Sequence, residues 1–289
     1  LMNYIKVKGL SKSYSDIDAL KNLSMEIEAG TLFGILGPNG AGKSTLIKIL
    51  ATLIEPDSGE VFINNINLIK NSRKIRELIG YVAQDIALDK ILTGRELLDF
   101  QSDLYHINKN KKFERIKKLI DQLEMSDWID RKCGTYSGGM KRRIDLAAGL
   151  LHLPKVLILD EPTVGLDIES RNIIWQLLKD LRNNGMTIIL SSHYLDEIDK
   201  LADRLVIIDD GRVIAQGTPA ELKNKLGGDR VTLKVREFSN QEEAKNICRI
   251  LSSIDGISQI IINQAQGFSI NFVADKEKDL LTKLKVELA

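Results

Sequence analysis

A glycine-rich segment near the N-terminus has the residue types and spacing of a loop that binds phosphate. Gly37 is followed by four residues and then by Gly42, Lys43 and Ser44. Glycines let backbone N–H groups curl around phosphate oxygens, and the lysine adds a positive charge, while Ser44 can offer its hydroxyl to Mg²⁺. The candidate phosphate-binding residues are Gly37, Pro38, Asn39, Gly40, Ala41, Gly42, Lys43, Ser44 and Thr45.

Two acidic residues follow an apolar run that is typical of a buried strand. The run is Val156–Leu159, and Asp160 and Glu161 come directly after it. In a chain with a phosphate loop, we expect Asp160 to bind the coordination shell of the Mg²⁺ ion. Glu161 is then the candidate general base, because a carboxylate at this place can polarise a water that attacks the terminal phosphate.

The phosphate loop lies between a predicted strand and a predicted helix, which is the context that such a loop requires. Thr31–Leu36 has a strand pattern and runs straight into the loop, and Leu46–Leu50 then has helical apolar spacing. Upstream, Tyr4–Val7 and Leu23–Ile27 also have strand patterns. The N-terminal part is therefore predicted to be rich in strands.

Helices dominate the middle of the chain, and buried strands return after it. Residues from about Leu92 to Leu153 have helical periodicity, and Thr93 and Glu96 have the spacing of a capping box. Val156–Leu159 and Thr187–Leu190 read as buried strands separated by a helical segment. This alternation predicts an α/β fold with a mainly parallel sheet that is covered on both faces.

The sequence pattern changes after Gly227 and Gly228, which predicts a second, smaller domain. We place the boundary near Leu226, giving domains at 2–226 and 228–289. The order of predicted elements is β-α-β-β-α, most of a ferredoxin-like α+β unit. These elements are strands at Val231–Val235, Ile257–Ile262 and Phe268–Phe272 and helices at Gln241–Leu251 and Lys276–Leu288.

The composition is that of an ordinary globular protein. Hydrophobic residues make up 43% and charged residues 28%, which excludes disordered and low-complexity classes. The formal net charge of +1 gives no general attraction to nucleic acid, so we expect no nucleic-acid partner. The apolar runs are far shorter than the roughly 20 residues of a membrane span. Cys133 and Cys248 cannot form a disulfide framework, and we expect a soluble protein of a reducing compartment.

A further motif precedes the acidic strand. The segment Tyr136-Ser137-Gly138-Gly139-Met140 resembles the Leu-Ser-Gly-Gly-Gln signature of ABC-type ATPases, and it opens a predicted helix at Lys141–Leu151. The signature, the phosphate loop and the acidic strand occur in the order of that family, and the resemblance extends from about Asn3 to Leu226. It implies a P-loop NTPase fold with an N-terminal antiparallel β subdomain and a helical signature subdomain at about 88–153.

The resemblance also implies roles for single residues around the nucleotide. Tyr14 resembles the aromatic residue that stacks on adenine. Gln84 is similar to the glutamine that touches Mg²⁺ and senses the transporter. His193 resembles the switch histidine that contacts the γ-phosphate, so the candidate catalytic residues are Lys43, Glu161 and His193.

In the family that the chain resembles, each ATP is bound between two subunits. The signature residues Ser137, Gly138 and Gly139 and the loop residue Asp167 would then contact the nucleotide of the opposite subunit. The signature departs from the common form at Tyr136 and Met140, but the backbone amides and the serine hydroxyl remain. The resemblance thus implies ATP and Mg²⁺ as cofactors and a homodimer or a paired ATPase subunit.

The signature form is similar to that of the daunorubicin-resistance branch of ABC drug exporters. This resemblance implies separate permease subunits in the membrane, with this chain at the cytoplasmic, inner face of the cell membrane. It implies export of drug or lipid-like cargo driven by ATP hydrolysis.

Two alternatives remain from the sequence. One is a soluble ABC-type ATPase that acts as a nucleotide-gated clamp on DNA or the ribosome. The short interval between phosphate loop and signature leaves no room for the coiled coils of repair ATPases, and translation-type members usually carry two cassettes. The other alternative, a small-molecule P-loop kinase, leaves the signature, Gln84 and His193 without a role.

Overall fold

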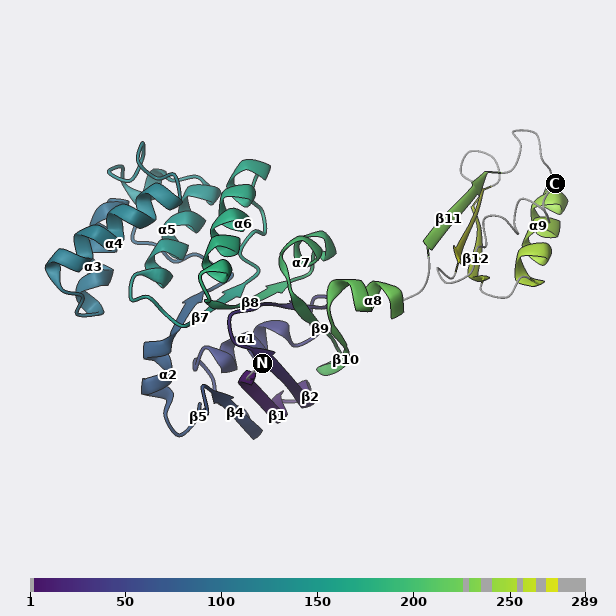
Figure 1. The fold of residues 1–289 in the computed structure, drawn as a ribbon, viewed down its shortest axis with the longest axis horizontal. Coiled ribbons are helices and arrows are strands. Elements are labelled where there is room, and N and C mark those ends of the chain that lie inside the picture. The colour runs from purple at the N-terminus through teal and green to yellow at the C-terminus, as the bar shows by residue number, and fades with distance from the viewer. Residues whose placement is uncertain (1–2, 226–228, 235–240, 254–256, 264–268, 275–289) are drawn as a thin grey trace. The chain divides into compact units, whose positions relative to one another are not determined.

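The computed structural model describes residues 3–225, 229–234, 241–253, 257–263 and 269–274 (Figure 1). Contacts within the chain divide it into two units, Leu1–Pro219 and Ala220–Ala289. The larger unit contains every candidate functional residue named above, so its two sheets and its helices are described first.

The N-terminal sheet is antiparallel, with the strand order β2-β1-β4-β5. Its strands are β1 (Asn3–Tyr14), β2 (Ile17–Glu28), β4 (Ser58–Ile63) and β5 (Ile66–Asn67). Buried and exposed residues alternate at the end of β2, as expected for a sheet with one covered face. The first strand is longer than the predicted segment Tyr4–Val7, because β1 pairs with β2 along its whole length and with β4 on its other side.

The central sheet has the strand order β10-β9-β3-β8-β7-β6. Its strands are β3 (Leu32–Leu36), β6 (Ile79–Val82), β7 (Val156–Asp160), β8 (Thr187–Ser192), β9 (Arg204–Asp209) and β10 (Arg212–Gly217). All neighbours pair in parallel except β9 and β10. The β9–β10 hairpin turns at Asp210 and Gly211, which both have positive φ, the backbone conformation that Asp-Gly favours in a tight hairpin turn. The predicted, mainly parallel sheet is confirmed.

Helices cover both faces of the central sheet (Figure 1). One core cluster joins apolar side chains of the N-terminal sheet, α1 and the central sheet, so α1 packs between the two sheets. The helices α5, α6 and α7 contact strands of the central sheet. The helices of this unit before its C-terminal end are α1 (Lys43–Leu50), α2 (Ser72–Leu78), α3 (Gly94–Leu104), α4 (Lys109–Gln122), α5 (Gly138–Leu150), α6 (Ile168–Asn183) and α7 (Leu195–Leu201).

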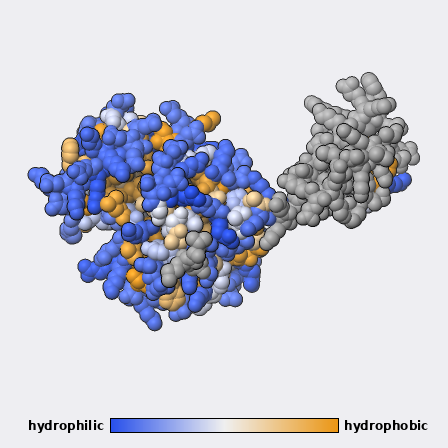
Figure 2. All heavy atoms as spheres, viewed as in Figure 1, coloured by the Kyte–Doolittle hydropathy of each residue, from blue (hydrophilic) through white to orange (hydrophobic). Residues whose placement is uncertain are grey.

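The helical region predicted at about 88–153 contains α3, α4 and α5 and a short 3₁₀ turn at Cys133–Thr135. The predicted capping box is present at the start of α3, since Thr93 accepts from the Glu96 amide and Glu96 accepts from the Thr93 amide. Hydrophilic residues cover most of the viewed face of the larger unit (Figure 2). Among the described residues, none of the helices has the length and apolar character needed to cross a membrane.

The smaller unit begins within α8, at Ala220, and continues with β11, α9, β12 and β13. These elements are α8 (Pro219–Lys225), β11 (Asp229–Lys234), α9 (Gln241–Ser253), β12 (Ile257–Asn263) and β13 (Ser269–Ala274). The strands form an antiparallel sheet of order β11-β13-β12. The predicted final helix at residues 276–288 lies outside the described residues, so the ferredoxin-like assignment stays a prediction.

Candidate nucleotide-binding site

The phosphate loop connects β3 to α1, and two of its glycines are required by close backbone approaches. A Cβ atom at Gly37 would overlap the carbonyl oxygen of Ile208, and one at Gly42 would overlap the carbonyl oxygen of Ala19. Gly42 also has φ 101°, a conformation that side chains disfavour. The glycines thus let the loop fold tightly against the sheet, with the N-terminus of α1 at its end. A helix N-terminus presents unpaired N–H groups and a partial positive charge, which suits an anion.

Lys43 occupies the first turn of α1 and is almost fully buried, with 5% of its surface exposed. Its ammonium group donates to the carbonyl oxygens of Gly37 and Pro38 at 2.9 and 3.0 Å. The same nitrogen lies 3.5 Å from Glu161 Oε1. The charge is therefore held at the loop by three oxygen atoms rather than in solvent.

The acidic residues lie at the C-terminal end of β7, where Asp160 is the last residue of the strand and Glu161 follows it. Asp160 is the partner of Ser191 in the parallel β7–β8 register, and the Ser191 hydroxyl donates to Asp160 Oδ1 at 2.6 Å. The same hydroxyl accepts a hydrogen bond from the Glu161 amide at 3.0 Å. Ser191 thus positions both acids. Sequence reasoning missed it, although a serine ending the apolar strand Thr187–Leu190 was a visible signal.

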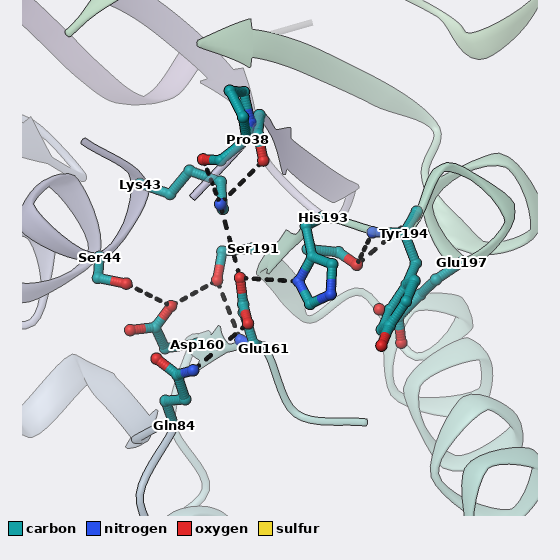
Figure 3. A network of polar contacts seen from close by, with 12 residues as sticks. Pro38, Lys43, Ser44, Gln84, Asp160, Glu161, Ser191, His193, Tyr194 and Glu197 are labelled. Carbon is teal, nitrogen blue, oxygen red and sulfur yellow. Dashed lines mark hydrogen bonds and ion pairs between the residues drawn. The ribbon is translucent and has the colours of Figure 1, made fainter. Parts of the chain in front are cut away.

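Glu161 is the centre of the site. Its backbone has φ 46° and its side chain is buried. Lys43, Gln84 and His193 point toward its carboxylate from three different segments (Figure 3). Gln84 Nε2 donates to Glu161 Oε2 at 3.4 Å, and His193 Nδ1 lies 3.1 Å from Glu161 Oε1, outside hydrogen-bond geometry. The structure therefore brings the three candidate catalytic residues and Gln84 together.

The donors predicted for Mg²⁺ also lie at this site. The Ser44 hydroxyl donates to Asp160 Oδ1 at 3.3 Å, and Asp160 is 2% exposed. The set contains a hydroxyl, a carboxylate and the Gln84 amide, all of which offer oxygen. Mg²⁺ prefers one or two carboxylates together with substrate phosphates, so these residues fit that ion. In the described part of the chain, no group of three or more His, Cys, Asp or Glu residues forms a separate metal cage.

A cavity of about 490 Å³ opens over these residues. It is lined by Ile17, Ala19, Asn39, Gly40, Gly42, Lys43, Ser44, Thr45, Gln84, Glu161, Val164 and His193. The volume falls within the usual range of small-molecule sites. Ile17 and Ala19 were missed by sequence reasoning. Ile17 is 71% exposed. Tyr14 does not line the cavity, and its predicted contact with adenine stays a prediction.

The signature residues lie apart from this cavity. Ser137 caps α5 by accepting from the Met140 amide at 3.3 Å, so the helix begins at Gly138 rather than at the predicted Lys141. Ser137 and Gly138 are exposed, and none of the signature residues lines the phosphate cavity. The helix N-terminus at Ser137 and Gly138 is thus exposed outside the phosphate cavity, whereas Gly139 is buried.

Asp167 lies next to the signature in the same chain. It caps α6, where its carboxylate accepts from the Ser170 amide at 2.8 Å and from the Ser170 hydroxyl at 3.0 Å. These hydrogen bonds hold the pKa of Asp167 below its usual value. A Cβ atom at Gly139 would collide with the Ser170 side chain, so the starts of α5 and α6 are closely packed. The two elements predicted to cross the dimer therefore form one surface.

Tyr136, the departure at the first signature position, has a clear structural role. Its buried hydroxyl accepts from the Gly94 amide at 3.0 Å and lies 3.2 Å from the carbonyl oxygens of Trp128 and Ile129. Burial raises the pKa of Tyr136 to about 12. The hydroxyl ties the signature loop to the start of α3, a contact that a leucine cannot make.

Comparison with known proteins identifies the family of the chain. The family model described as ABC transporter matches residues 20–164. The chain is 42% identical over 233 residues to the daunorubicin resistance ATP-binding protein DrrA3 of Streptomyces coeruleorubidus, covering 81% of this chain and 74% of the relative. It is 40% identical over 227 residues to the linearmycin resistance ATP-binding protein LnrL of Bacillus subtilis, covering 78% and 73%.

Solved structures resemble the larger unit. A structure of the ATP-binding subunit of an ABC transporter matches with a TM-score of 0.71 at 28% identity, covering 77% of this chain and 93% of that one. The ATP-binding cassette MJ0796, solved as a dimer in a post-hydrolysis state with ADP and Pi, matches with a TM-score of 0.68 at 29% identity, covering 74% and 98%. Sequence, fold and site geometry agree: the chain belongs to the ATP-binding proteins of ABC transporters, which hydrolyse ATP to drive transport.

Proposed function

We propose that this chain binds Mg-ATP at the phosphate loop and hydrolyses it with Glu161 as the general base. The Glu161 carboxylate accepts a proton from water while the water oxygen attacks the γ-phosphorus. The bond to the oxygen that bridges the β- and γ-phosphates breaks, and ADP and phosphate leave. The position of Glu161 supports this role, since Lys43, Gln84 and His193 surround its carboxylate.

Several residues would interact with the negatively charged phosphates. Lys43 can exchange its carbonyl acceptors for phosphate oxygens, because it already lies at the loop. His193 would contact the γ-phosphate from the end of β8. Ser44, Gln84 and Asp160 would hold Mg²⁺, which when bound neutralises charge on the phosphates.

The complete site is proposed to need two chains. The observation that carries this proposal is that Ser137 and Gly138 are exposed at the start of α5 and do not line the phosphate cavity. A γ-phosphate in one chain would meet Ser137, Gly138 and Gly139 of a second chain, close to its Asp167. The ATP then links two chains, and hydrolysis removes the link. The dimeric state of the similar cassette MJ0796 supports this arrangement.

The transport function follows from this cycle and from the relatives. We propose that the chain drives separate permease subunits and works at the cytoplasmic face of the cell membrane. Export of drug or lipid-like cargo is supported by relatives named for daunorubicin resistance, linearmycin resistance and, at 36% identity in Rhizobium etli, Nod factor export.

A pull-down from detergent-solubilised membranes tests the permease. The tagged chain should recover an integral membrane protein with several spans at near-equal amounts, identified by mass spectrometry. A catalytically inactive Glu161→Gln chain serves as the control, since it should recover the same partner. Recovery with ribosomes or DNA alone would overturn the transporter proposal in favour of a nucleotide-gated clamp.

A further inference from the structure

Arg142 is a buried cation that the site described above does not use. It lies on α5, five residues after the helix-capping Ser137, and is 3% exposed. Its guanidinium donates to two successive backbone carbonyls, those of Ala83 and Gln84, the second at 2.7 Å. These carbonyls belong to the segment that leaves β6 and carries the Gln84 side chain into the phosphate cavity.

Burying this charge is costly, so its contacts are informative. Burial lowers the pKa of Arg142, and the carboxylate of Asp145 lies 3.6 Å away on the next turn. A guanidinium is planar and presents two N–H groups side by side, so it can hold two carbonyls in fixed relative positions. The Arg142 side chain therefore fixes the two peptide groups on either side of the Gln84 Cα atom.

The backbone that Arg142 holds carries the side chain that contacts Glu161, the proposed general base. Gln84 Nε2 donates to Glu161 Oε2 at 3.4 Å. A shift of α5 along or about its axis would move Arg142, and Arg142 would move the Gln84 backbone with it. The amide of Gln84 would then change its place relative to the Glu161 carboxylate. The helix α5 thus carries the signature at its first turn and, at its second turn, Arg142, which binds the backbone of the Gln84 segment.

We propose that Arg142 is a positioning residue that couples the signature of a chain to the Gln84–Glu161 pair of the same chain. The inference rests on the proposed two-chain site. In that arrangement the signature contacts the partner's ATP, whereas Glu161 acts on the chain's own ATP. Arg142 therefore links the two ATP sites of the dimer, so that occupancy of one site sets the geometry of the other.

The adjacent Arg143 provides a matched control. It lies on the same helix and donates to two backbone carbonyls, those of Leu123 and Glu124, both at 3.2 Å. These carbonyls follow α4, inside the helical region and away from Gln84 and Glu161. Replacement of either arginine by lysine keeps the charge and removes the planar fork. Arg143→Lys thus removes a backbone contact of the same helix that does not involve the Gln84 segment.

The test is the steady-state ATPase rate of the purified full-length chain as a function of ATP concentration. We expect wild type to have a Hill coefficient between 1 and 2, since the dimer has two sites. Arg142→Lys should lower the Hill coefficient below the wild-type value and kcat about tenfold, the effect of losing one charge-assisted hydrogen bond, with KM changed less than about twofold. Arg143→Lys should keep both the coefficient and kcat.

Arg142→Gln is the second variant, because its neutral amide can still donate to one carbonyl and places no charge at position 142. An unchanged Hill coefficient in both Arg142 variants, or an equal loss in Arg143→Lys, would overturn the coupling role. Light scattering with ATP separates this failure from failure of the two-chain site. A wild-type dimer without cooperativity contradicts the coupling alone, whereas a chain that stays monomeric contradicts the proposed site and the coupling together.

Discussion

At the scale of single residues, the site is arranged around one carboxylate. Glu161 receives the Gln84 amide on one oxygen and faces Lys43 and His193 with the other. The Ser191 hydroxyl fixes the Glu161 backbone through its amide. A base held by this many contacts loses little freedom when it reacts, which favours orientation of the attacking water.

The phosphate loop gives the first prediction. Lys43→Ala should weaken ATP binding and lower the ATPase rate by roughly 100-fold or more, because the variant loses the charge that stabilises the transferring phosphate. Nucleotide titration by fluorescence and a phosphate-release assay measure the two effects. Lys48→Ala is the control, since Lys48 is an exposed lysine on the same helix. Normal turnover of Lys43→Ala would contradict the assignment of the loop.

A second prediction concerns pH and Asp145. Burial raises the pKa of Asp145 from 3.8 to about 6, although Arg142 partly opposes this. Because the folded-state pKa exceeds the unfolded-state value, this group contributes stability below pH 3.8 and that contribution is lost as the pH rises through about 6. The uncharged Asp145→Asn variant lacks this dependence.

Urea unfolding of the two proteins measures the effect. The free energy of unfolding of Asp145→Asn, relative to wild type, should increase by about 2 kcal/mol between pH 4.5 and pH 7.5. Other groups titrate in both proteins and cancel in the difference. A difference that stays constant with pH would show that Asp145 ionises as readily in the folded chain as in the unfolded one.

At the scale of elements, the signature helix is attached on two sides. Arg142 connects α5 to the segment after β6, and Tyr136 connects the preceding loop to the start of α3. The starts of α5 and α6 pack together at Gly139 and Ser170. The helix that carries the signature is thus attached both to the segment with Gln84 and, through the loop before it, to α3.

Tyr136→Phe tests the attachment to α3. The variant keeps the ring and leaves the Gly94 amide without its acceptor, so we expect a loss of about 1–3 kcal/mol in the free energy of unfolding. Tyr105→Phe is the control, because Tyr105 is a partly exposed tyrosine of the same region. Chemical denaturation followed by fluorescence measures both. Equal stability of Tyr136→Phe and wild type would contradict a structural role for the hydroxyl.

Elements set by local residues could be predicted from the sequence. The capping box of Thr93 and Glu96 and the turn at Asp210 and Gly211 depend on neighbours within a few positions, and both are present. The role of Ser191 could not be predicted in the same way, because it depends on the register of β7 against β8.

Contacts between segments that are distant in sequence explain why the roles of other residues could not be predicted. Tyr136 reaches Gly94 and Arg142 reaches Gln84, and neither pairing leaves a local sequence pattern. The exposed Ile17 is part of the cavity only because β2 begins beside the phosphate loop. Motifs of fixed spacing therefore supplied the candidate reactive groups, whereas the residues that position them could be recognised only from the fold.

At the scale of the whole molecule, the larger unit holds all the nucleotide-contacting candidates. The separate smaller unit, Ala220–Ala289, leads to a further prediction. A chain truncated after Gly227 should keep ATP binding, measured by nucleotide titration, because all the described residues that line the phosphate cavity lie between Ile17 and His193. Loss of the cooperative unfolding transition in the truncated chain would show that the proposed domain boundary is wrong.

The most direct measurement of the central claim is the mass of Glu161→Gln in solution by light scattering. The variant should bind ATP without hydrolysing it, so we predict a doubled mass with Mg-ATP and a single chain with Mg-ADP. Gly138→Asp in the same background should stay a single chain, because nothing lies within 4 Å of a Cβ there and the added carboxylate would repel the partner's phosphate. A single-chain mass of Glu161→Gln at saturating Mg-ATP, or dimerisation unaffected by Gly138→Asp, would contradict a site shared between two chains.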